Sequence, residues 1–192
     1  MQRILWMLLD AAVASVVLIP LFYWLNKRYY QNPGKTVCYF LFAFYLSAVY
    51  EVVGLPDVTY VRFHPNTNLI PFAYMFSDHT GSLLNVALFF PLGTMLPLFW
   101  RYFHPFYRTV LFGIGTSLLI EILQLFTYRA TDVNDLITNT LGTAAGWLAA
   151  KLILRLFPGI RSSSHGAEAF TVYWGAFAVM FFVQPLLMNI LI

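Results

Sequence analysis

Residues 82–100 read SLLNVALFFPLGTMLPLFW, a block without a charged side chain. A helix needs about 20 apolar residues to cross the hydrocarbon core of a membrane. Of the whole chain, 60% is hydrophobic and only 10% is charged, whereas soluble domains carry about 25% charged residues. Such blocks predict six transmembrane helices, over 4–25, 36–55, 82–100, 107–128, 133–157 and 169–192. The predicted fold class is all-α, a polytopic membrane helix bundle forming a single transmembrane domain over 1–192.

Other features of the composition exclude several classes of protein. The first block, 4–25, is expected to be a span, since it is too long for a signal peptide and lacks a basic start with a small-residue cleavage site. Cys38 is the single cysteine, so no internal disulfide can form. The net charge of +3 comes from bases in short loops beside the spans, which does not indicate nucleic-acid binding. No Gly-rich phosphate loop occurs, and no cofactor is predicted.

The basic residues predict an orientation in the membrane. Lys and Arg in short loops favour the cytoplasmic side. Eight of the eleven bases fall in the loops after the first, third and fifth predicted spans or at the span ends beside these loops, namely Lys27, Arg28, Lys35, Arg101, Arg108, Lys151, Arg155 and Arg161. These loops are therefore expected inside the cell, with both termini outside.

The acidic residues gather on the other side. Seven of the eight carboxylates fall in predicted outer loops or the outer halves of spans, namely Asp10, Glu51, Asp57, Asp78, Glu121, Asp132 and Asp135. Only Glu168 lies on the basic side. Acidic residues contribute little to orientation, so this grouping does not merely restate the rule. It indicates a polar site near the outer leaflet.

The loop over 56–81, between the second and third predicted spans, is the one long connection in the chain. Long loops in compact domains are often functional. This loop carries apolar residues such as Leu69 and Ile70, so it is expected to fold back onto the bundle or dip into the interface. Asn66 and Asn68 are expected to satisfy the backbone at turns. The loop is either a packed amphipathic connector or a lid or wall over the site.

Polar and small residues form one stripe on each of the fourth and fifth predicted spans. The stripes are Gly113, Ser117, Glu121 and Gln124 on one, and Asp132, Asp135, Asn139, Gly142 and Gly146 on the other. Spacings of three and four place residues on one helical face, and a short connection lets the two faces meet. The small residues are predicted to close the inner part of this seam. The carboxyl and amide side chains are predicted to line its outer end.

The third predicted span supplies a further wall. Pro91 frees a backbone carbonyl and is expected to kink the helix. Asn85, Phe89 and Gly93 share one face of the same span. This face is expected to border the seam.

A carboxylate in hydrocarbon is costly, so Glu121 is expected to face the bundle, meet a partner or carry a proton. Arg129, just beyond the same span, is the expected partner. With Arg62, Asp132 and Asp135 these residues bring together two positive and three negative charges. Such a cluster could hold a proton or receive a phosphate, carboxylate or ammonium group.

Structural roles compete with this functional interpretation. Asp132 is well placed as a helix N-cap, and Asp135 as an acid in the first turn. Glu121 could serve only to form a structural ion pair with Arg129. Gln124 and Asn139 could serve only to form hydrogen bonds between helices.

Four sequence blocks occur in a defined order and spacing. They are Arg62 followed by Asn68-Leu69-Ile70-Pro71-Phe72; Asn85-x-x-Leu88-Phe89-x-Pro91-Leu92-Gly93; Ser117-x-x-x-Glu121-x-x-Gln124; and Arg129-x-x-Asp132-x-x-Asp135-x-x-x-Asn139-x-x-Gly142. Together they resemble the VanZ-like family of bacterial membrane proteins, over a core of about 62–146. The resemblance implies a multi-pass protein of the bacterial cell membrane, associated with resistance to glycopeptide antibiotics, especially teicoplanin. It brings no agreed chemistry with it.

Three functional hypotheses remain open from the sequence. The first is a binding protein whose partners are membrane lipids and a lipid-linked envelope precursor or lipoglycopeptide. The second is an intramembrane enzyme in which Glu121 or Asp135 is the general acid or base and Arg62 and Arg129 hold a phosphate. Asp132 and Asp135 alone are weak evidence for a metal, so none is predicted. The third is a transporter or flippase, ranked last because no internal repeat is found. The oligomeric state stays open.

Overall fold

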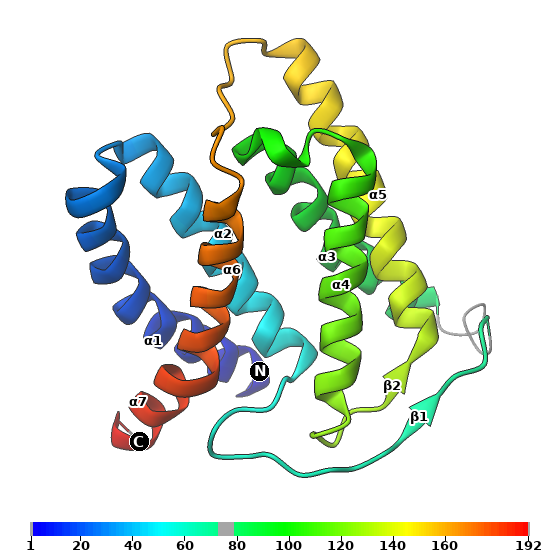
Figure 1. Ribbon diagram of the computed structural model, residues 1–192. Helices are drawn as coiled ribbons and strands as arrows, with labels where there is room; N and C mark the ends of the chain where they lie inside the picture. Colours follow the sequence, from blue (N-terminus) through cyan, green and yellow to red (C-terminus); the bar gives the residue numbers. More distant parts are fainter. Residues whose placement is uncertain (1, 73–78, 192) are drawn as a thin grey trace. The chain divides into compact units, whose positions relative to one another are not determined.

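The computed structural model describes residues 2–72 and 79–191, most of which lie in helices (Figure 1). The α-helices are α1 (Gln2–Leu25), α2 (Pro33–Val53), α3 (His79–Phe99), α4 (Phe106–Gln124), α5 (Val133–Leu156), α6 (Ala167–Ala178) and α7 (Gln184–Leu191). The shorter elements are the π-helices η1 (Asn26–Tyr30) and η3 (Val179–Val183), the 3-10 helix η2 (Arg101–Phe103), and the strands β1 (Thr67–Asn68) and β2 (Thr131–Asp132). The predicted all-α fold class is confirmed.

Four helical runs among the described residues are long and apolar enough to cross a membrane. They are α2, α3, α4 and the run Ala167–Ile190, which joins α6, η3 and α7. These runs coincide with four of the six predicted spans. The other two predicted spans, 4–25 and 133–157, correspond to α1 and α5, which are not among the four. The number of membrane crossings therefore stays a prediction.

Local sequence signals explain where α2 begins and ends. Asn32 is its N-cap, and the side chain accepts a hydrogen bond from the backbone N–H of Lys35 at 3.0 Å. Pro33 follows at the first helical position, where its missing N–H costs nothing. Gly54 ends the helix with a φ of 65°, a left-handed conformation that glycine adopts without strain.

A proline explains why the last helical run is interrupted by η3. Pro185 has no N–H to donate to the carbonyl four residues earlier, which belongs to Phe181. The backbone N–H of Val58 donates to that same carbonyl at 3.0 Å. The first part of the long loop thus satisfies a carbonyl that the proline leaves without its helical partner.

The chain divides into two compact units, which we describe separately. Unit 1 comprises Met1–Val61 and Ala167–Ile192, and unit 2 comprises Arg62–Gly166. In unit 1 an ion pair joins the first turns of α2 and α6, with Lys35 Nζ 2.6 Å from Glu168 Oε1. The Tyr39 hydroxyl donates to the other oxygen of Glu168. Glu168, the single acid predicted on the basic side, is therefore held by two partners.

In unit 2, glycines let α3 and α5 approach backbone to backbone. A Cβ atom added to Gly142 would lie 2.4 Å from the carbonyl oxygen of Val86, and one on Gly146 would lie 2.1 Å from that of Phe90. From the other side, a Cβ atom on Gly93 would lie 2.0 Å from the carbonyl oxygen of Thr143. The glycine pair of α5 therefore packs against α3, whereas the sequence led us to expect it in the seam with α4. Periodicity defines the face of a helix but not which neighbour covers it.

Candidate functional site

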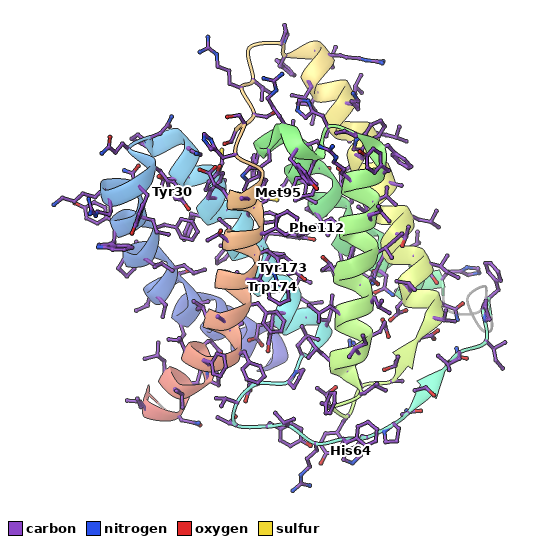
Figure 2. The ribbon with its side chains drawn as sticks, in the orientation of Figure 1. Tyr30, His64, Met95, Phe112, Tyr173 and Trp174 are labelled. Atoms are coloured by element: carbon purple, nitrogen blue, oxygen red, sulfur yellow. The ribbon has the colours of Figure 1, made fainter. Side chains whose placement is uncertain are left out.

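The long loop folds back onto the connection between α4 and α5, as its apolar character predicted. The backbone N–H of Arg62 donates to the carbonyl of Phe126 at 3.0 Å, and that of His64 donates to the carbonyl of Leu125 at 2.8 Å. β1 then pairs with β2 in parallel, with Asn68 opposite Asp132. Figure 1 shows the two strands side by side, and Figure 2 shows the ring of His64 on the loop. The loop forms one wall of the α4–α5 connection.

Asparagine side chains fasten this wall at two further points. Asn68 Nδ2 donates to Asp132 Oδ2 at 3.1 Å, while Asn68 Oδ1 accepts from the backbone N–H of Ile70 at 3.3 Å. Asn134 Oδ1 accepts from the backbone N–H of Phe72 at 2.6 Å. Asn68 thus satisfies the backbone at a turn, as expected, and also orients Asp132.

The register of α4 against α5 brings the predicted stripes together. The two helices are antiparallel neighbours (Figure 1). Asn139 Nδ2 donates to Ser117 Oγ at 2.9 Å, and a Cβ atom on Gly113, one turn further along α4, would lie 2.4 Å from Thr143 Oγ1. One turn from this pair in the other direction, towards the α4–α5 connection, Glu121 of α4 lies level with Asp135 of α5. The predicted seam between the two helices therefore exists, with amide and carboxyl groups towards the α4–α5 connection.

Glu121 is buried, with 5% of its surface exposed. Its Oε2 accepts from the backbone N–H of Asp132 at 2.8 Å, and its backbone carbonyl accepts from the hydroxyl of Thr131 at 2.9 Å. Arg129 is exposed, and among the described residues it makes no ion pair with Glu121. The expected ion-pair partner is therefore replaced by a backbone N–H at the start of α5, where the positive end of the helix dipole favours a carboxylate.

Asp132 and Asp135 each combine a structural role with a side-chain contact. Asp132 is the N-cap of α5, and its Oδ1 accepts from the backbone N–H of Asn134 at 2.8 Å. Its other oxygen takes the hydrogen bond from Asn68. Asp135 lies in the first turn of α5 and accepts from Asn85 Nδ2 of α3 at 2.7 Å. The face of α3 that carries Asn85 thus borders the site, as the sequence predicted.

The seam contains two buried amide side chains, Gln124 and Asn139. Gln124 ends α4 with only 4% of its surface exposed. Asn139 is equally buried, and its Nδ2 is bound to Ser117. The Oδ1 atom of Asn139 is buried and has no hydrogen-bond partner within 2–72 and 79–191.

The two predicted arginines form no ion pair with the acidic residues of the site among the described residues. Arg62 and Arg129 are both exposed, and no ion pair links either of them to Glu121, Asp132 or Asp135 in the described part of the chain. Nor do the described residues include a group of three or more His, Cys, Asp or Glu side chains that could hold a metal ion. Asp78 lies outside the described residues.

Sequence reasoning missed Asn134 and Thr131, which hold the loop and Glu121 in place. Both lie beside the α5 stripe rather than on it, so helical spacing did not select them. The polar character of Asn134, next to the N-cap at the start of an otherwise apolar helix, is the one signal that could have identified it.

The fold and the site define a membrane protein with a buried cluster of carboxyl and amide groups at one end of a helical unit. A model of the VanZ/LLP1 family matches residues 36–155. The chain therefore belongs to the VanZ/LLP1 family, and it is a VanZ-family membrane protein with apolar helices. The match runs from α2 to the end of α5 and includes every residue of the candidate site. Searches of curated proteins and of solved structures found no match.

Proposed function

We propose that this protein binds an amphiphilic molecule of the bacterial cell envelope at the seam between α4 and α5, and that it thereby lowers sensitivity to teicoplanin. The observation that carries the proposal is the buried Glu121, with the half-buried Asp132 and Asp135, beside a loop with exposed apolar side chains. Leu69 and Ile70, next to Asn68, are 69% and 68% exposed. An amphiphile matches both parts, because its polar group reaches Glu121 and its hydrocarbon meets the loop.

The charges of unit 2 support an outward-facing site. We name its two ends by their residues: the acidic end carries Glu121, Asp132 and Asp135, and the basic end carries Arg101, Arg108, Lys151 and Arg155. They are opposite ends, because Arg108 begins and Glu121 nearly ends α4. The positive-inside rule then places the basic end in the cytoplasm. The proposed arrangement is a multi-pass protein with both termini outside.

Cysteine labelling tests this orientation. In a Cys38→Ser background, Phe63→Cys at the acidic end and Arg161→Cys after α5 both introduce thiols at exposed positions. A membrane-impermeant maleimide applied to intact cells is expected to label the cysteine at 63, and to label that at 161 only after lysis. The reverse pattern contradicts an outward-facing site.

Antibiotic susceptibility tests the function. Expression of the chain in a teicoplanin-sensitive bacterium is expected to raise the inhibitory concentration, and Glu121→Gln is expected to remove the increase at an equal protein level. Asp57→Asn is the matched control. This carboxylate accepts hydrogen bonds from the backbone N–H groups of Thr59 and Tyr60 in unit 1, and it is not one of the seam residues. Full protection by the Glu121 variant would show that the seam is only structural.

A further inference from the structure

The space between α4 and α5 contains a buried acceptor without a donor. Asn139 Oδ1 is buried and has no hydrogen-bond partner among the described residues, and the residue as a whole is only 4% exposed. Its Nδ2, on the same carbon atom, donates to Ser117 Oγ of α4 at 2.9 Å. Oδ1 therefore belongs to an amide group that lies against α4. Buried polar atoms in folded proteins are nearly always paired, so this oxygen indicates a missing donor.

The neighbouring groups are acceptors as well. Glu121 lies one turn from Ser117, and Asp135 lies one turn from Asn139, on the faces that meet. The Oε2 atom of Glu121 takes the backbone N–H of Asp132, while no hydrogen bond reaches Oε1 from the residues that the structure describes. The exposed Arg62 and Arg129 form no ion pair with Glu121 in that part of the chain. Asn139 and Glu121 thus present an amide and a carboxyl oxygen to the seam, and Glu121 forms no ion pair with a basic side chain in the described part of the chain.

We propose that the occupant of this seam presents a primary ammonium group, which donates to Asn139 Oδ1 and to the Glu121 carboxyl. An ammonium carries three N–H donors and no acceptor, so it complements a set of oxygen acceptors. A phosphate or a carboxylate offers only oxygens and would face the carboxyls with like charge. The inference rests on the proposed function, because it names the polar group of the amphiphile. The same ammonium can belong to a lipid headgroup or to a small soluble amine.

Binding to the purified full chain in detergent, followed by native mass spectrometry, tests the ammonium. The probes are phosphatidylethanolamine, the same lipid with its amine acetylated, and free ethanolamine. The amine lipid is expected to bind at least about tenfold more tightly than the acetylated lipid, the range of a charge-assisted hydrogen bond. Tighter binding of the lipid than of ethanolamine identifies a lipid headgroup as the source, whereas equal binding of the two identifies a soluble amine. Equal binding of both lipids, or no binding of any probe, overturns the ammonium.

Two variants of one residue test the role of the orphan oxygen. Asn139→Leu removes it and is expected to abolish the preference for the amine, whereas Asn139→Asp keeps an oxygen acceptor and is expected to retain it. Thr140→Val is the control, since that hydroxyl bonds only within α5, to the carbonyl of Leu136 at 2.7 Å. If Asn139→Leu does not fold, loss of the preference in Asn139→Asp still overturns the proposal. These outcomes are separate from the proposed function, which fails if expression of the chain gives no teicoplanin protection or if Glu121→Gln keeps it.

Discussion

The two ends of unit 2 use polar side chains in opposite ways. At the basic end, side chains donate to backbone carbonyls: Thr109 Oγ1 to Phe103 at 2.7 Å, Trp147 Nε1 to His104 at 3.0 Å, and Ser162 Oγ to Pro97 at 3.1 Å. At the acidic end, side-chain oxygens accept, as when Glu121 takes the N–H of Asp132 at 2.8 Å. One end satisfies carbonyls that helices leave without partners. The other gathers oxygens that include Asn139 Oδ1, a buried atom with no donor in the described chain.

This difference separates a structural role from a binding role. The last carbonyls of a helix have no partner within the helix, so donors to the carbonyls at the ends of α3 and η2 stabilise the fold and leave no unpaired group to bind a ligand. Trp100, between α3 and η2, is fully buried there. Gathering carboxyl groups does not stabilise a fold by itself, because like charges repel when they are removed from water. We therefore expect substitutions at the basic end to lower stability, and those at the acidic end to lower function.

The largest expected effect falls on the contact between α3 and α5, on which both ends depend. Gly146→Val places side-chain atoms where a Cβ already lies 2.1 Å from the carbonyl oxygen of Phe90. The helices must separate, so the variant is expected to lose about 3 kcal/mol or more of stability. Gly115→Ala in α4 is the control, because an added Cβ meets nothing within 4 Å, and it is expected to gain about 0.5–1 kcal/mol. Thermal unfolding in detergent measures both, and equal midpoints contradict the close packing.

The helix boundaries and much of the site were predictable because they depend on local signals. The N-cap role of Asp132 and the meeting of Ser117 with Asn139 follow from capping preferences and helical spacing. The pairing of β1 with β2 did not follow, since it joins two residues of a loop to two residues 64 positions away, as in Asn68 with Asp132. Nor did charge alone show that a backbone N–H, rather than Arg129, meets Glu121.

The next effect is expected at the basic end. Thr109→Val keeps the shape of a fully buried side chain but removes the donor to the carbonyl of Phe103. Leaving that carbonyl unpaired is expected to cost about 1–3 kcal/mol, with teicoplanin protection unchanged at an equal protein level. Thr171→Val, an exposed position whose hydroxyl bonds within α6, is expected to change stability by less than about 0.5 kcal/mol. A Thr109 variant as stable as this control would remove the structural role of the basic end.

At the acidic end, a substitution is expected to lower function much more than stability. Asn85→Ala removes the donor that holds Asp135 Oδ1 at 2.7 Å. The expected loss of stability is about 0.5–1.5 kcal/mol, while protection against teicoplanin falls to the level of cells without the protein. Leu84→Ala, at a neighbouring position that is 63% exposed, is expected to keep protection. If both variants protect equally, orientation of Asp135 has no part in the function.

The smallest expected effect is a pH dependence confined to the basic end. Burial lowers the pKa of His104 below its ordinary value, and the nearby Lys151 and Arg101 lower it further, against an opposing hydrogen bond to the backbone at Pro97. The unfolded chain therefore takes up the proton before the folded chain does. The neutral ring contributes stability that is complete above about pH 6.5, the value of a free histidine, and that declines as the pH falls through the lower folded value. The unfolding midpoint is expected to drop between pH 7.5 and pH 5.5 by less in His104→Gln than in the parent chain, whereas an equal drop in both would assign the dependence to other groups.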